Sequence, residues 1–257
     1  MYLARRPYEN VFLQWVLEGG HGATTPDEFV LHRDRTGAIT GVAYFGPQLV
    51  LAADDDNAVD AFAVELRRHP GMRSFVGPKL AIDRLWKDVS SWHGRPTLVR
   101  EHQPLYALVP RALVPIADVD VRLAAPDDAD AVIENSAEMM VAELGYDPRE
   151  HRQGFGAGVR RGIVQGTWWV WVVDGTLRFQ CNVGSRTRAT AQIQGVWTPP
   201  NQRRRGYATA ALSAVARHLL ESNATLSLYV NDFNVEAIAL YERIGFVQVG
   251  ELSTVIF

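Results

Sequence analysis

The chain has 257 residues, of which 47% are apolar and 10% aromatic, and its net charge is −3. It is too apolar for a disordered chain, and its acidic balance disfavours a nucleic-acid-binding protein. No stretch has the length and apolarity of a membrane helix, and the N-terminal residues do not resemble a signal peptide. Its single cysteine, Cys181, allows no internal disulfide, so we expect a protein of the reducing cytoplasm.

The first half of the chain alternates between strand and helix patterns. Its predicted β-α-β-α-β order occupies residues 49–54, 58–69, 73–78, 79–89 and 97–109. The following segment, 110–120, contains two prolines and no periodicity, which predicts a linker. We therefore expect an N-terminal domain over residues 1–115 and a C-terminal domain over residues 118–257.

The second half gives clearer signals. We predict a strand at 121–125, a helix from 127 to Leu144, a polar Gly-rich connection over 146–166, a hairpin at 167–183, a strand at 189–197, a helix from Gly206 to Leu219, a strand at 225–230, a helix from Asn234 to Gly245 and a closing strand pair at 246–257. Asp174-Gly175 is typical of a type I′ turn inside the hairpin. Asn234 and Gly245 are typical helix-capping residues.

The order of elements in residues 189–257 repeats that of residues 49–109. Trp86 in the first copy falls near the place of Tyr241 in the second. Although few residues match, the shared order predicts two related halves. Each would be a mixed sheet with helices on both faces.

Three consecutive arginines, Arg203, Arg204 and Arg205, follow a predicted strand and precede a predicted helix. The first turn of a helix has free N–H groups and a positive dipole end, which favour an anion. Gly206 has no Cβ, and Ala208 keeps the next turn narrow, so a phosphate could approach the backbone closely. This arrangement suits a diphosphate, with the arginines adding bidentate contacts.

Two other phosphate-binding loops do not fit the sequence. A P-loop needs Gly-Lys-Ser/Thr, which is not present. The run Gly154-Phe155-Gly156-Ala157-Gly158 lacks the spacing of a dinucleotide fingerprint and does not follow a predicted strand. We interpret that run as a flexible connection.

The arginine run resembles the Q/R-x-x-G-x-G/A loop of the GNAT (GCN5-related) N-acetyltransferases. GVWTPPNQ (195–202) resembles the strand that leads into that loop, and NVEAIALYERIGFVQVGE (234–251) resembles the second motif of the family. The resemblance covers about residues 118–257. It implies an α/β (mixed α+β) fold of two tandem GNAT-like domains, each a mostly antiparallel twisted sheet flanked by helices. The central parallel strands of the C-terminal domain would splay apart.

The resemblance also implies acetyl-CoA as the cofactor. The pyrophosphate would lie on the loop, and the backbone of the preceding strand would bind the pantetheine arm. The implied cofactor-binding residues form two runs, 196–198 and 203–209, and one helix cap: Val196, Trp197, Thr198, Arg203, Arg204, Arg205, Gly206, Tyr207, Ala208, Thr209 and Asn234.

By the same resemblance, Tyr241 is the candidate acid for the thiolate leaving group, and a backbone N–H near Val196 or Trp197 would stabilise the oxyanion. Packing of Tyr241 on the sheet is an alternative. Many family members carry a Glu on the strand before the loop. Here that strand carries Gln192 and Gln194, which cannot take a proton.

Another residue must then take the proton of the amine, either directly or through a water molecule. An amine of low pKa would need no strong base. The acidic residues expected on the acceptor side are Glu138, Glu143 and Glu251, each of which could also be a solvated surface residue. His151 lies in the same region, and a surface position is expected for it. No histidine pair has metal-ligand spacing, so we expect no metal. Trp168, Trp169 and Trp171 fit either the core or an acceptor pocket.

The first half lacks the features of the loop. After its first predicted strand the chain reads Asp54-Asp55-Asp56-Asn57, without a glycine, and three carboxylates would repel a pyrophosphate. We expect this half to bind no CoA and to pack on the second half or shape the acceptor cleft.

The leading hypothesis is therefore an acetyl-CoA-dependent N-acetyltransferase that transfers acetyl to a primary amine of a small molecule or peptide. The alternative is a non-catalytic acetyl-CoA-binding or regulatory protein of the same fold. A nucleic-acid module using the arginines is disfavoured by the net charge. We expect no membrane partner, and a homodimer is left open.

Overall fold

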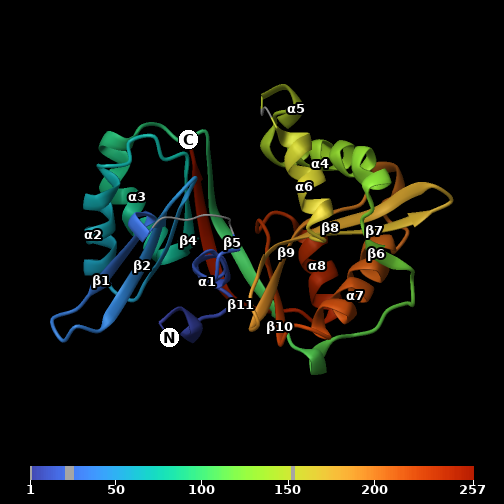
Figure 1. Ribbon diagram of the computed structural model, residues 1–257, viewed down its shortest axis with the longest axis horizontal. Helices are drawn as coiled ribbons and strands as arrows, with labels where there is room; N and C mark the ends of the chain where they lie inside the picture. Colours follow the sequence, from blue (N-terminus) through green and yellow to red (C-terminus); the bar gives the residue numbers. More distant parts are fainter. Residues whose placement is uncertain (1, 21–25, 152–153) are drawn as a thin grey trace.

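The computed structural model describes residues 2–20, 26–151 and 154–257. In this part of the chain, strands from both halves form a single mixed sheet through the whole molecule (Figure 1). The strands are β1 (Phe29–Arg33), β2 (Ile39–Phe45), β3 (Leu49–Ala53), β4 (Ser74–Pro78), β5 (Leu98–Leu108), β6 (Val121–Leu123), β7 (Trp168–Val173), β8 (Thr176–Arg186), β9 (Thr190–Trp197), β10 (Thr225–Tyr229) and β11 (Val247–Ile256).

Helices cover the sheet on both faces. The α-helices are α1 (Val11–Leu17), α2 (Asp56–Leu66), α3 (Lys79–His93), α4 (Ala129–Leu144), α5 (Pro148–His151), α6 (Phe155–Val164), α7 (Tyr207–Leu220) and α8 (Val235–Ile244). Short 3-10 turns are η1 (Leu3–Arg5), η2 (Pro26–Glu28), η3 (Pro110–Ala112), η4 (Pro126–Asp128) and η5 (Pro200–Gln202).

The two halves exchange their last strands. The spatial order is β1-β2-β3-β4-β11-β5-β10-β9-β8-β7-β6. Strand β11, from the end of the chain, pairs antiparallel with β4 of the N-terminal half, and β5 pairs antiparallel with β10 of the C-terminal half. The two exchanged strands pair with each other at the centre of the sheet (Figure 1). The predicted repeat is visible here as β3-α2-β4-α3-β5 and β9-α7-β10-α8-β11.

The alternation of side chains along each strand separates two hydrophobic layers. In the N-terminal half, Ala43 and Phe45 of β2 pack with α2 and α3, whereas Val42 and Tyr44 pack with α1 on the opposite face. In the C-terminal half, α7 and α8 cover one face of the sheet, while α4 and α6 pack near β7 and β8 in a separate cluster. Each half therefore has helices on both faces, as expected.

Several local signals give the predicted structure. Asp174 and Gly175 both have positive φ, 49° and 68°, as a type I′ turn requires. The Asn234 side chain accepts a hydrogen bond from the N–H of Ala237 (3.2 Å) at the start of α8. Gly245 ends that helix in the left-handed conformation, with φ 108°.

Two expectations about local structure are wrong. The run from Gly154 to Gly158 is not a flexible connection: Gly154 caps α6 in a left-handed conformation, and the other residues form the start of that helix. Helix α6 forms because Val159 and Ile163 pack against Val132 of α4. Residues 246–257 contain one strand, β11, rather than a pair, and its pairing with β5 shifts register between Gln248 and Gly250.

Candidate functional site

Strands β9 and β10 part where the site was expected. They pair in parallel at only three positions, the last being Gln192 with Ser227. Beyond it, β9 continues to Trp197 alongside β8, whereas the chain after β10 follows β5, with the N–H of Val230 donating to Pro104 O (3.2 Å). The edge of β9 beyond Gln192 therefore has no paired strand, and its backbone is free to bind an extended ligand arm.

A β-bulge changes the direction of the backbone at this edge. Gly195 has φ 61°, and β9 carries one extra residue between the partners of Gln180 and Asn182 on β8. The indole N–H of Trp197 and the hydroxyl of Thr198 are buried and have no hydrogen-bond partner among the described residues. Unpaired buried polar groups are costly unless a ligand or water satisfies them. The end of β9 thus fits a ligand with polar atoms.

The loop after β9 forms an open cradle at the start of α7. Gly206 caps α7 with φ 78°, and an added Cβ would meet no atom within 4 Å. Its carbonyl accepts the N–H of Ala210 (3.1 Å), so the N–H groups of the first turn have no acceptor in the helix. This combination of open space, free N–H groups and a helix N-terminus suits a phosphate.

The three arginines of the loop are not equivalent. The guanidinium of Arg203 lies 4.4 Å from the ring centre of Trp197, and its Nε donates to Thr198 O (3.0 Å). Arg204, with φ 58°, and Arg205 are exposed and form no ion pair within the described chain. Arg203 therefore stabilises the loop, whereas Arg204 and Arg205 are available to an anion.

Tyr241 lies on α8, and only 6% of it is exposed. Its ring packs near Tyr106 and Phe246, and its hydroxyl has no hydrogen-bond partner in the part of the chain that the structure describes. Burial raises the pKa of Tyr241, and the charge of Glu143 raises it further. The phenol therefore stays protonated at neutral pH and can donate.

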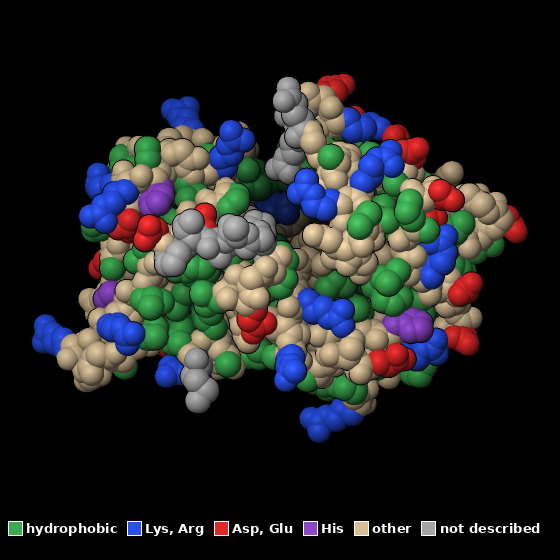
Figure 2. Space-filling model, viewed as in Figure 1, with side chains coloured by type: hydrophobic (Ala, Val, Ile, Leu, Met, Phe, Trp, Pro, Cys, Tyr) green, Lys and Arg blue, Asp and Glu red, His purple; other side chains and the backbone are tan. Residues whose placement is uncertain are grey.

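Glu143 is the candidate acceptor-side carboxylate that the structure places near Tyr241. It lies in the last turn of α4, and its Oε2 is 3.7 Å from Nη2 of Arg100 on β5. Partial burial raises the pKa of Glu143, while the charge of Arg100 opposes the rise. Tyr229, at the end of β10, is close enough for both charges to influence its pKa, which burial raises. Figure 2 shows a hollow between the two lobes, with Lys or Arg atoms deep inside it.

Arg100 was missed by the sequence analysis. A signal existed, because the charged run Arg100-Glu101-His102 interrupts an otherwise apolar strand. The sequence does not show where this charged run lies, because its position depends on the strand exchange that puts β5 beside β10.

The other candidate acids lie elsewhere. Glu138 lines a separate depression between α4 and η5, together with Asn135 and Gln202. Glu251 hydrogen-bonds to His102 (2.7 Å) and faces a cavity of the N-terminal half. Of the three candidate acids, Glu143 is the one whose charge contributes to raising the pKa of Tyr241.

The tryptophans of β7 are partly buried and contact other side chains. Trp169 stacks on His218, Trp171 meets Tyr207 edge-on, and Trp168 packs with the cluster under α4 and α6. The side chain of His151 lies outside the described residues. No group of metal-ligating side chains occurs among the described residues.

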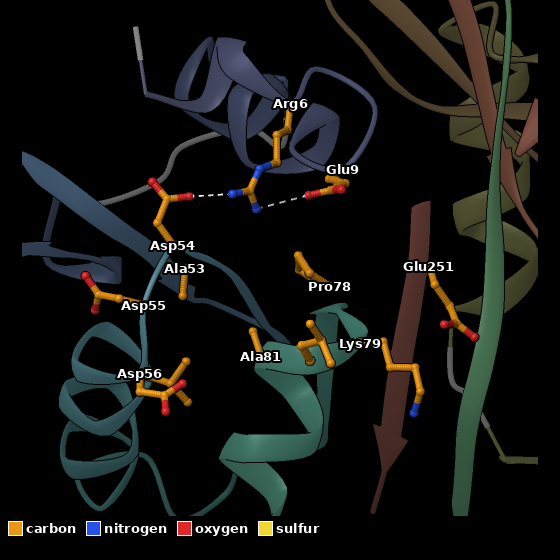
Figure 3. Close-up of a pocket in the computed structure, with 12 residues that line it drawn as sticks. Arg6, Glu9, Ala53, Asp54, Asp55, Asp56, Pro78, Lys79, Ala81 and Glu251 are labelled. Carbon is orange, nitrogen blue, oxygen red and sulfur yellow. Dashed lines mark hydrogen bonds and ion pairs between the residues drawn. The ribbon is translucent and has the colours of Figure 1, made fainter. Parts of the chain in front are cut away.

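The N-terminal half has a corresponding splay with opposite charge. Strands β3 and β4 pair at only two positions, and a cavity of about 590 Å³ lies between their ends (Figure 3). Asp55 caps α2 by accepting the N–H of Ala58 (2.9 Å), and Arg6 bridges Asp54 (2.7 Å) and Glu9 (3.5 Å). The helix N-terminus that would receive a phosphate is therefore occupied by the protein's own carboxylates.

Taken together, the tandem α/β halves, the splayed strands and the loop–helix cradle define the fold of an acyltransferase. Residues 131–246 match the acetyltransferase (GNAT) family, and they form a GNAT acetyltransferase domain. Residues 30–132 match a domain of unknown function (DUF4081). A comparison with curated proteins gives no match.

Solved structures of similar fold extend over almost the whole chain. A GCN5-related N-acetyltransferase from Kribbella flavida is 14% identical, with a TM-score of 0.65 over 96% of this chain and 95% of that one. A GNAT-family acetyltransferase from Colwellia psychrerythraea is 11% identical, with a TM-score of 0.59 over 98% and 97%. A tandem GNAT protein from the clavulanic acid biosynthesis pathway is 12% identical, with a TM-score of 0.53 over 95% and 87%. At these identities the likeness concerns the fold, and it supports the two-domain arrangement.

No helix among the described residues has the length and apolarity needed to cross a membrane.

Proposed function

We propose that the C-terminal half transfers an acetyl group from acetyl-CoA to a primary amine. The observation that supports this best is the open, left-handed Gly206 at the start of α7, next to the unpaired edge of β9. The net charge of −3 favours a small-molecule or peptide amine over a nucleic acid as the acceptor.

Acetyl-CoA fits the residues that surround this edge. The first turn of α7, from Tyr207 to Thr209, would hold the pyrophosphate with Arg204 and Arg205. The backbone of Val196, Trp197 and Thr198 would hold the arm, and Asn234 would lie beside it. When bound, this group supplies an acetyl thioester, which the amine attacks with loss of the thiol.

Two side chains would handle the protons. Tyr241 is protonated at neutral pH, and burial, which raises its pKa, keeps it so; its Oη would hydrogen-bond and donate its proton to the leaving thiolate. Glu143 would accept, at a carboxylate oxygen, the proton that the amine nitrogen loses. A backbone N–H of the bulged β9 would stabilise the oxyanion. The carboxylates at the corresponding place in the N-terminal half support a role for that half in shaping the cleft rather than in binding CoA.

A second candidate is a non-catalytic acetyl-CoA-binding protein. The observation that favours it is the lack of a carboxylate at two positions of β9. Gln192 is buried there, and the Gln194 amide donates a hydrogen bond to Asn182 Oδ1 (3.1 Å). Neither can act as a base.

Single-turnover transfer separates the two. Protein in excess of radiolabelled acetyl-CoA is mixed with a panel of amines, and labelled amide is measured beside equilibrium binding of CoA. Transfer that depends on Tyr241 supports the enzyme. Binding of CoA without transfer to any amine or peptide supports the second candidate.

A further inference from the structure

Arg100 is a charged side chain with few partners. Its side chain is only 16% exposed, and Nη2 is buried without a hydrogen-bond partner in the described chain. Its one ion pair is with Glu143, at 3.7 Å, beyond hydrogen-bond distance. A guanidinium offers five donors in a planar fork, and leaving such donors buried and unsatisfied is costly. Arg100 therefore keeps a donor for an oxygen-rich partner.

The strand exchange explains why this arginine lies at the acceptor side. A bulge on β5 gives it one extra residue between Arg100 and Gln103 relative to β11. Gln103 bonds to Asn231 (3.2 Å), in the chain just after β10, whereas His102 bonds to Glu251 (2.7 Å) at the N-terminal cavity. The bulge thus divides the charged run of β5 between the two sites. Arg100 goes with Glu143 and Tyr229.

Arg100 and Glu143 together present one positive and one negative group side by side. An α-amino acid carries the complementary pair, because its ammonium and carboxylate are attached to the same carbon atom. A carboxylate would meet the guanidinium fork with two parallel hydrogen bonds, and the ammonium would meet Glu143. The free hydroxyl of Tyr229 adds a further donor beside the carboxylate.

We propose that Arg100, supplied by the N-terminal half, binds the carboxylate of the acceptor, and that the acceptor is a free α-amino acid. This inference rests on the proposed acetyl transfer, whose substrate class it specifies. With the carboxylate on Arg100, the α-ammonium lies at Glu143, which takes its first proton and frees the lone pair that forms the new C–N bond. The C–S bond breaks, and the thiolate sulfur takes the proton of Tyr241. The second proton that the nitrogen loses restores Tyr241, and Glu143 releases the first proton to solvent. An amine without a neighbouring carboxylate leaves Arg100 unsatisfied and binds weakly.

The test compares matched acceptors. Alanine, phenylalanine and lysine are each offered as the free acid and as the α-carboxamide, at a pH where Glu143 is deprotonated in every variant. For the wild type we expect kcat/KM to favour the acid. Arg100→Gln should lower kcat/KM for the acids about 10- to 100-fold while leaving the carboxamides unchanged. For Arg100→Lys, kcat/KM for the acids should lie between the values of the wild type and Arg100→Gln, because lysine keeps the positive charge without the planar guanidinium fork.

Arg217→Gln is the matched control, since Arg217 is a half-exposed arginine near the end of α7, and its ion-pair partner is Asp118, in the segment before β6. It should leave the acid preference intact. Equal losses for acid and carboxamide in Arg100→Gln would overturn the proposal, because they would mean that Arg100 acts only through Glu143. A wild type that acetylates carboxamides or peptide N-termini as well as free amino acids would also overturn it.

Calorimetric binding of the same free amino acids to the CoA-loaded protein gives a readout independent of turnover. Binding that Arg100→Gln abolishes supports the proposal even if acetyl transfer is not seen, in which case only the proposed function fails. The lack of binding of any free amino acid to the wild type would overturn the inference alone.

Discussion

The backbone of Gly245 lies against the carbonyl group of Ala112, so closely that an added Cβ would be 1.9 Å from that oxygen. The contact joins the end of α8 to the turn that follows β5, and the N–H of Val114 bonds to Ile244 O (2.9 Å) beside it. Gly245 also has φ 108°, a conformation that side chains rarely adopt. The glycine thus caps a helix and allows the two exchanged halves to approach.

Gly245→Ala should therefore destabilise the protein by about 2–4 kcal/mol, since strain and overlap with a backbone atom act together. Denaturant unfolding measures the loss. Gly71→Ala is the control, because Gly71 has ordinary φ and open space around its Cβ position, and its effect should stay within about 0.5 kcal/mol. Similar losses in the two variants would show that the contact with Ala112 is not tight.

A second prediction concerns the cradle at the start of α7. Gly206→Val should abolish CoA binding while the protein stays folded, because the new side chain would project into the space above the first turn. Isothermal titration should give one CoA per chain for the wild type and none for the variant, since the carboxylates of the N-terminal half provide no second site.

Gly37→Val is the matched control, since Gly37 has a similar φ, 87°, with open space around it, in the turn between β1 and β2. It should lose similar stability, about 1–3 kcal/mol, and keep CoA binding. Retained affinity in Gly206→Val would show that the backbone loop does not bind the phosphates.

The local part of this structure could be predicted from the sequence. Asn234, Gly245 and the Asp174-Gly175 turn are signals that act within a few residues, and all have the expected geometry. The Gly-rich run that begins α6 has the composition of a flexible segment, yet it is helical because Val159 and Ile163 pack in the cluster with α4.

The strand exchange could not be predicted, because strand pairing is decided by residues distant in the chain. Nothing in β5 or β11 specifies that each pairs with the other half. The candidate site depends on this pairing, so Glu143 was one of three acids that the sequence could not rank, and Arg100 was not considered. The structure separates the three acids, because it places Glu138 and Glu251 in other depressions.

Tyr241→Phe should lower kcat for acetyl transfer by about 100-fold or more, the usual loss of a general acid, with little change in CoA affinity. Because burial raises the pKa of Tyr241, its ionisation should not limit the rate in the neutral range. Tyr106→Phe is the control: its ring lies 6.4 Å from that of Tyr241, but its hydroxyl is bonded to Glu242 (3.1 Å). Its kcat should be nearly unchanged. An equal loss in both variants would indicate a packing role for Tyr241.

The last prediction concerns the pH dependence of the reaction. A base works only when deprotonated, so kcat/KM should rise with pH as Glu143 loses its proton. Partial burial raises the pKa of Glu143, which places this rise at higher pH than for an ordinary Glu. Arg100 opposes the shift, so Arg100→Gln should move the rise to still higher pH. Glu143→Gln should remove the rise of kcat/KM with pH, whereas Glu138→Gln should retain that rise.

Because the acceptor amine titrates alike in all these variants, the difference between profiles reports the enzyme group. A profile of Glu143→Gln that keeps the wild-type rise would assign the base to another residue or to water. A rise that moves to lower pH in Arg100→Gln would contradict the ion pair of 3.7 Å, because losing a nearby positive charge can only make Glu143 hold its proton more tightly.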